Sequence, residues 1–157
     1  MRFLTPFRLA AYLLLLFCAG HTAGGMLAQK SLGADSDVVF AQMKTVHFVF
    51  NGADSTWYGF WMGFGLTVSA FLLLVALAAW QLDAVSAQAW PSVSVIAWGL
   101  VAAMAFNGVM AVKFFFLGPT VFSALITGLL VTGIVRKSRA VRSATPGGAS
   151  PAPSLPA

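Results

Sequence analysis

Residues 57–80 read WYGFWMGFGLTVSAFLLLVALAAW and contain no charged side chain. A helix needs about 20 apolar residues to cross the hydrocarbon core of a bilayer, which is about 30 Å thick. Tryptophans stand at both ends of the stretch, and this residue type gathers at the two membrane interfaces. The stretch therefore predicts one membrane-spanning helix.

Three further apolar runs have the same character, from about residue 9 to 28, from 92 to 112 and from 119 to 135. The chain is 59% hydrophobic and 8% charged, with a mean hydropathy of +0.87, which leaves too few polar side chains to cover a soluble domain. We expect an all-α membrane protein in which residues 1–139 form a four-helix transmembrane bundle. The Pro-, Ala-, Ser- and Gly-rich tail, 140–157, is predicted to be disordered.

The basic residues predict the orientation of the chain. Six of the nine Lys and Arg residues flank the predicted spans: Arg2, Arg8, Arg136, Lys137, Arg139 and Arg142. Because cytoplasmic flanks carry an excess of Lys and Arg, both termini are predicted to be cytoplasmic. The formal net charge of +5 is then explained by membrane anchoring, and no nucleic-acid partner is expected.

The first apolar run has a competing interpretation as a cleaved secretory signal. Basic residues precede it, and the small residues Ala23, Gly24 and Gly25 follow it. We favour a retained helix, because Gly20 and Gly24 form a GxxxG face that permits close helix approach. By the same argument Gly59 and Gly63 in the second run are expected to serve helix packing.

Residues 29–56 form the only sizeable extramembrane segment between the predicted spans. We predict an interfacial amphipathic helix at about 36–50, capped by Asp35 or Ser36 and ended by Asn51-Gly52. A run of about 15 residues is too short to span, so this helix is placed at the outer interface or over the mouth of the bundle. Its expected apolar face comprises Val38, Val39, Phe40, Met43, Val46, Phe48, Val49 and Phe50.

Depth arithmetic predicts one polar layer inside the bundle. At a rise of about 1.5 Å per residue, His21 lies about 18 Å and Asn107 about 22 Å above the inner boundary. Polar side chains facing lipid are costly, so both are expected to point inward. The candidate pocket comprises His21, Thr22, Thr67, Asn107 and Ser123, with His47 above it.

Two interpretations of that layer stay open. One is a ligand or proton-handling site built on His21, and the other is interhelical hydrogen bonding, which averages under about 1 kcal/mol per contact. A haem held by His21 and His47 is chemically possible, but the pattern is weak and no cofactor is predicted. No metal site is predicted either, since no carboxylate or second cysteine joins the histidines.

Several segments resemble a family of small bacterial four-helix membrane proteins of uncharacterised activity. The resemblance rests on Gly20-His21-Thr22, on residues 43–52, on the aromatic and Gly-rich residues 57–66, and on Trp80-Gln81-Leu82. It implies the same architecture and a place in the bacterial inner membrane. A basic and an acidic residue commonly accompany the aromatics in that family, whereas here Asp54 and Ser55 precede Trp57.

Three functional classes remain. The first is a small integral membrane protein with a binding or accessory role, for an apolar small molecule or another membrane protein, with a homo-oligomer as one possibility. The second is a membrane enzyme that acts on a lipid-soluble substrate with His21 as acid or base. The third, an oligomeric transporter, lacks the carboxylate within a span that proton-coupled transport usually needs. We expect the first, and no catalytic residue is assigned.

Overall fold

The computed structural model describes residues 4–28 and 31–144. Within them, four helical stretches are long and apolar enough to span a membrane: Pro6–Leu27, Trp57–Ala84, Trp90–Phe114 and Leu117–Ser143. The prediction of four long apolar helices is therefore confirmed.

The first span consists of helix α1 (Pro6–Ala19) followed by a π-helical segment, η1 (Gly20–Leu27). Thr5 caps α1, since its Oγ1 accepts a hydrogen bond from the Arg8 amide at 3.2 Å. In η1 the Ala28 amide donates to the Ala23 carbonyl, five residues back, at 2.8 Å. Most π-helical segments are a single turn inside an α-helix and often mark functional sites, so this longer segment is unusual.

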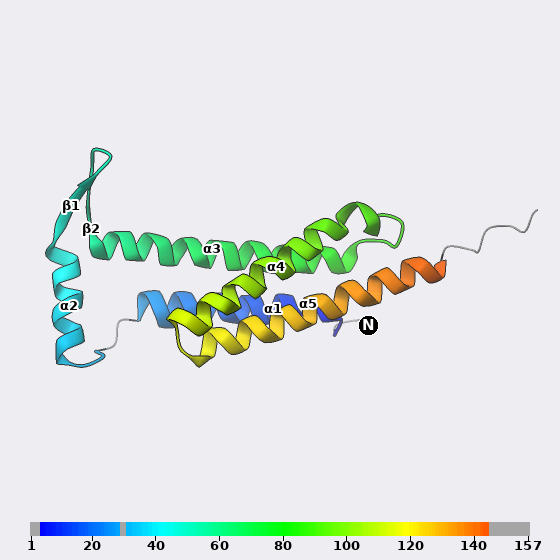
Figure 1. Ribbon diagram of the computed structural model, residues 1–157, viewed down its shortest axis with the longest axis horizontal. Coiled ribbons are helices and arrows are strands. Elements are labelled where there is room, and N and C mark those ends of the chain that lie inside the picture. The colour runs from blue at the N-terminus through cyan, green and yellow to red at the C-terminus, as the bar shows by residue number, and fades with distance from the viewer. Residues whose placement is uncertain (1–3, 29–30, 145–157) are drawn as a thin grey trace, which may run out of the picture.

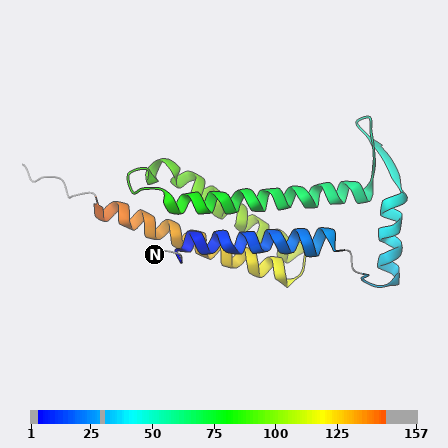
Figure 2. The same ribbon diagram turned by 180° about the vertical axis from the view of Figure 1, so that it is seen from behind.

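The remaining spans are α3 (Trp57–Ala84), α4 (Trp90–Phe114) and α5 (Leu117–Ala144). Helix α1 packs against both α3 and α5, and α4 packs along α5. Figure 1 shows α4 crossing the bundle on one side, and Figure 2 shows α1 on the opposite side, between α3 and α5. Helix α1 is therefore the element that joins the second span to the last.

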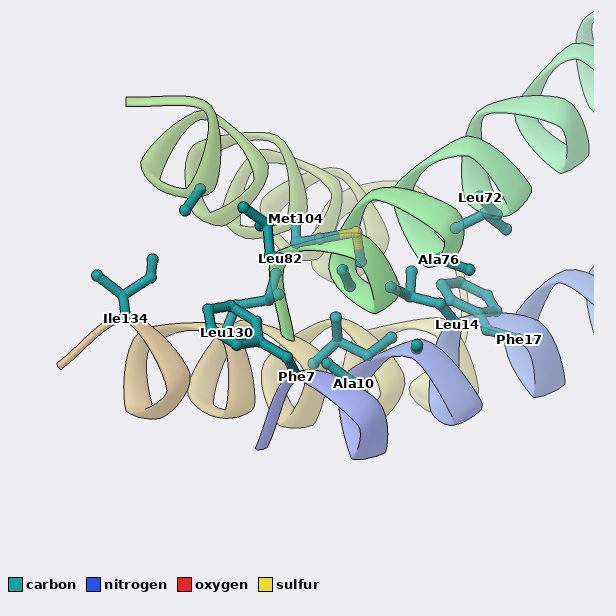
Figure 3. Close-up of a cluster of buried hydrophobic side chains, with 14 of the residues drawn as sticks. Phe7, Ala10, Leu14, Phe17, Leu72, Ala76, Leu82, Met104, Leu130 and Ile134 are labelled. Carbon is teal, nitrogen blue, oxygen red and sulfur yellow. The ribbon is translucent and has the colours of Figure 1, made fainter. Parts of the chain in front are cut away.

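The core lies where α1 meets α3 and α5. On α1, Ala10 and Leu14 are fully buried, and Phe7 is 1% exposed. Figure 3 shows Leu14 and Phe17 of α1 beside Ala76 of α3, and Phe7 beside Leu130 of α5. Small residues on the contact faces, such as Ala10 and Ala76, let the helix backbones approach closely, as is usual between helices in lipid.

The segment between the first two spans differs from the prediction. Helix α2 covers Ala34–Thr45 only, and a β-hairpin follows it, with β1 (His47–Phe50) paired antiparallel to β2 (Ala53–Thr56). The predicted helix over 36–50 is thus wrong beyond Thr45. We call residues 34–56 the platform.

Local chemistry explains the hairpin. Asn51 and Gly52 both have positive φ, at 51° and 82°, as a two-residue type I′ turn requires. The left-handed conformation expected at Asn51-Gly52 is present, but it closes a hairpin instead of ending a helix. β-Branched and aromatic residues at 46–50 favour the strand. The expected capping by Asp35 or Ser36 is also wrong, because the helix begins at Ala34 after Gly33, with no side-chain cap.

The platform lies across one end of the bundle, transverse to the spans (Figure 1). Aromatic contacts join the platform to α3. The ring centroids of Phe48 and Trp57 are 4.6 Å apart, and those of Phe40 and Trp61 are 5.7 Å apart. Thr56 caps α3 by accepting a hydrogen bond from the Gly59 amide at 3.0 Å. Thr56 thus ends the hairpin and begins the second span.

At the other end, α5 runs on to Ala144. The predicted disordered tail therefore begins too early, because residues 140–144 continue the helix; the rest of the predicted tail lies outside the described residues. Ala140, Val141 and Arg142 are compatible with a helix, and composition alone does not mark its end. The bundle thus has two unlike ends, one covered by the platform and one rich in basic side chains.

The contact between Gly133 and Phe7 yields a test of the core. A Cβ added at Gly133 would lie 2.9 Å from the Phe7 ring, whereas one added at Gly128, on the same helix, would meet nothing within 4 Å. We expect Gly133→Ala to lower the free energy of unfolding by about 1–3 kcal/mol through overpacking. Gly128→Ala should raise it by up to about 1 kcal/mol through helix propensity. Unfolding in mixed micelles measures both, and effects of the same sign would contradict this packing.

Candidate functional site

A polar seam joins η1 to α3. His21 Nε2 donates a hydrogen bond to the Gly65 carbonyl oxygen at 2.9 Å, and Thr22 Oγ1 lies 2.7 Å from Ser69 Oγ. The Cys18 thiol donates to the Ser69 carbonyl at 3.3 Å. Every one of these contacts crosses between the first two spans, so the seam fixes their relative position.

Residues of the π-helical segment η1 make most of the contacts in the seam. Thr22 Oγ1 donates to the Cys18 carbonyl at 2.8 Å, a bond from a side chain to its own helix of the kind that bends helices. Met26 is buried, and its side chain fills the space that a Cβ at Gly65 would occupy. Gly65 therefore allows both the Met26 contact and the approach of His21 to its carbonyl oxygen.

A second polar pair joins α4 to α5. Asn107 Nδ2 donates to Ser123 Oγ at 2.8 Å, and Ser123 Oγ donates to the Pro119 carbonyl at 2.8 Å. Ser123 is 1% exposed. A Cβ on Gly108 would stand 3.3 Å from Ser123 Cβ, so the glycine lets the two helices come close.

The six residues of the predicted pocket do not form one hydrogen-bonded group. His21 and Thr22 bond to α3, Asn107 and Ser123 bond to each other, and among the described residues no hydrogen bond joins the two pairs. Thr67 is exposed and bonds to the Gly63 carbonyl of its own helix at 2.8 Å. Equal depth along the spans therefore did not imply contact, because depth carries no information on which helices are neighbours.

His47 lies apart from the spans, on strand β1 of the platform. Its Nδ1 is 3.2 Å from the carboxylate of Asp54 on the paired strand, and both side chains are exposed. His21 and His47 thus belong to different elements and take part in different contacts. In the described parts of the chain, no group of three or more His, Cys, Asp or Glu side chains is placed to hold a metal ion.

A groove opens between α4 and α5 beside the Asn107–Ser123 pair. Its volume is about 330 Å³. We call it the α4–α5 groove; it is lined by Met104, Ala105, Gly108, Val109, Val112, Thr120, Ser123, Ala124 and Thr127. Small and apolar residues make up most of this lining, with three hydroxyl groups on the α5 side.

A charged cluster that the sequence patterns did not predict lies at the opposite end from the platform. Arg8 Nε and Asp83 Oδ2 form an ion pair at 2.8 Å, with side chains 25% and 13% exposed. The Lys137 ammonium donates to the Asp83 carbonyl at 2.8 Å and to the Val85 carbonyl. The cluster therefore ties α1, the end of α3 and α5 together. A signal was available in the sequence, because Arg8 directly precedes the apolar run 9–28 and Asp83 closely follows the run 57–80, so that antiparallel helices bring both to the same end.

Aromatic rings support this cluster. The Arg8 guanidinium lies 4.3 Å from the ring centre of Trp80, within the range of a cation–π contact. Trp90 is buried and its Nε1 donates to Ser138 Oγ at 3.1 Å. Trp80 near the end of α3 and Trp90 at the start of α4 thus hold basic and polar side chains in place.

A cavity lies next to the same cluster. It has a volume of about 730 Å³. We call it the basic-end cavity; it is lined by Leu4, Thr5, Pro6, Phe7, Asp83, Val85, Ala87, Gly133, Arg136, Lys137 and Ala140. It brings together the start of α1, the link between α3 and α4, and the last turns of α5.

Within the described residues, none of the four glycines expected to serve packing lies against another spanning helix. A Cβ at Gly20, Gly24 or Gly63 would meet nothing within 4 Å, and one at Gly59 would meet the capping Thr56 hydroxyl at 3.2 Å. Packing of Gly20, Gly24 and Gly63 against another chain stays a prediction. The close helix contacts inside the chain are made at Gly65, Gly108 and Gly133 instead.

Comparisons with protein-family models, curated proteins and solved structures give no match for this chain.

The seam between η1 and α3 yields a test with a matched control. Thr22→Val removes the hydroxyl that contacts Ser69, and we expect it to lower the free energy of unfolding by about 0.6 kcal/mol, and by no more than about 1.7 kcal/mol. Thr67→Val removes an exposed hydroxyl that bonds within its own helix, so its effect should be close to zero. Unfolding of both variants in mixed micelles measures the difference, and equal effects would mean that the seam contributes nothing.

Proposed function

We propose that this chain is a multi-pass protein of the bacterial inner membrane that has a binding or accessory role. Arg8, Arg136, Lys137 and Arg139 gather at one end of the bundle, and basic flanks favour the cytoplasmic side. The platform then faces outward. Both termini lie in the cytoplasm on this assignment.

The exposed apolar side chains of the platform support a position in the outer interface. Val49 is 73% and Phe50 63% exposed, and both lie at the tip of the hairpin. The platform runs across the end of the spans, as an element in the interfacial plane would (Figure 1). Moving exposed Val and Phe side chains from water to the boundary of the acyl chains lowers their free energy, so α2 and the hairpin rest on the outer leaflet.

The ligand that fits the α4–α5 groove best is an apolar small molecule with one polar group. A volume of about 330 Å³ falls within the range of about 300–1,000 Å³ that is typical of small-molecule sites. Such sites are mostly apolar with a few placed polar atoms. Among the described residues the Thr120 hydroxyl makes no hydrogen bond, so it can meet the polar group of the ligand. This groove is the observation on which the proposal rests.

A second candidate, an enzyme that acts on a lipid-soluble substrate, rests on His21. With its Nε2 proton directed to the Gly65 carbonyl, the neutral ring keeps Nδ1 as an acceptor. The half-buried histidine also lies in a π-helical segment, where functional residues are often found. His21→Ala should abolish the activity of such an enzyme at an unchanged protein level, whereas a substitution in the α4–α5 groove should leave that activity unchanged.

Filling the groove tests the binding role. Ala105 is exposed and lines the groove, whereas Ala103, also exposed on α4, does not. We expect the protein purified in mild detergent to retain a stoichiometric apolar species that native mass spectrometry and lipid extraction detect. Ala105→Phe should reduce its occupancy at least tenfold, because a phenyl ring occupies the groove, and Ala103→Phe should leave it unchanged.

Equal retention in both variants would contradict binding in the groove. Loss of a protein band instead of a small molecule on Ala105→Phe would identify the occupant as a membrane partner, and loss of a dimer would identify it as a second copy. Either of these results would replace the small-molecule proposal.

A further inference from the structure

The basic-end cavity carries an excess of positive charge. Three cations, Arg8, Arg136 and Lys137, and one carboxylate, Asp83, stand at it or beside it, which leaves a net charge of +2. Basic pockets between membrane helices on the cytoplasmic side are suited to anionic lipid head groups. The charge balance of the cavity therefore favours an anion.

The three cations have different surroundings. Arg8 is neutralised by Asp83 at 2.8 Å, and Lys137 is held by the carbonyl oxygens of Asp83 and Val85. Arg136 is exposed, lines the cavity, and takes part in no ion pair within residues 4–28 and 31–144. Its guanidinium is the group available to a ligand, and its planar donors match the geometry of a phosphate.

The apolar residues that line the cavity suit the end of a lipid that carries its acyl chains. Leu4 is 75% exposed at the rim, while Phe7 and Gly133 form an apolar wall between α1 and α5. The predicted spans begin and end near this level, so the cavity lies at the boundary between head groups and acyl chains. A ligand with a phosphate at one end and acyl chains at the other can therefore bind Arg136 while its chains stay in the bilayer.

We propose that the basic-end cavity binds the phosphate diester head group of an anionic lipid. The site is separate from the α4–α5 groove, and only the assignment to the cytoplasmic leaflet rests on the proposed orientation. Arg136 contacts the phosphate, Lys137 adds positive potential from its fixed position, and the Arg8–Asp83 pair holds α1 against α3 so that the cavity keeps its shape.

Native mass spectrometry of the detergent-solubilised full chain tests this proposal, with phosphatidylglycerol and phosphatidylcholine of identical acyl chains as probes. We expect phosphatidylglycerol to bind at least fivefold more tightly. Arg136→Gln should weaken its binding about fivefold, the effect of about one cation near a membrane surface. The control is Arg142→Gln, which makes the same charge change at an exposed position of α5 outside the cavity and should change affinity less than twofold.

A second variant keeps the proposal testable if Arg136→Gln is poorly folded. Ala140→Phe fills the cavity without changing any charge, and it should also weaken phosphatidylglycerol binding at least fivefold. Equal losses for Arg136→Gln and Arg142→Gln, or equal affinity of the wild type for the two lipids, would overturn the proposal. Competition by millimolar glycerol phosphate would overturn it too, because the ligand would then be a soluble phosphate ester and not a lipid.

Discussion

Hydrocarbon offers no hydrogen bonds, and this constraint decides where each polar side chain of the spans can lie. Several hydroxyls return to a carbonyl four residues earlier on their own helix, as Thr67 does to Gly63 and Thr132 to Gly128. Other polar side chains reach a hydroxyl or a backbone carbonyl on a neighbouring helix, as in the seam between η1 and α3 and in the Asn107–Ser123 pair. Each interhelical pair is small in energy, but together they specify which helices are neighbours.

The same constraint makes α1 the central element. Its buried face is built from Ala and a few large residues, and it contacts both α3 and α5. At one end the π-helical segment joins it to α3 through His21 and Thr22, and at the other Arg8 joins it to Asp83. Helix α1 is therefore held by hydrogen bonds near the platform and by the Arg8–Asp83 ion pair at the basic end. The α4–α5 groove lies between two helices, whereas the basic-end cavity is lined by α1, α5 and the residues around the α3–α4 link.

Sequence patterns predicted the spans well because apolar length is a property of each segment alone. The neighbours of each helix were not predictable from depth: His21 and Asn107 share a level and yet bond to different helices. The hairpin was missed because Val46 to Phe50 fit the apolar face of a helix as well as a strand, and Asn51-Gly52 suits either a helix end or a type I′ turn. Arg8 was interpreted only as an anchor, although a carboxylate at the same boundary was visible in the sequence.

The proposed orientation places the basic end in the cytoplasm and the platform on the outer side of the membrane. Single cysteines replacing Asp35 on α2, Gln88 in the link between α3 and α4, and Ser143 near the end of α5 report this directly, in a Cys18→Ser background that keeps a donor for the Ser69 carbonyl. With an impermeant thiol reagent on intact cells, this orientation predicts labelling at position 35 alone, and at 88 and 143 only after permeabilisation. Labelling of 88 or 143 in intact cells would contradict it.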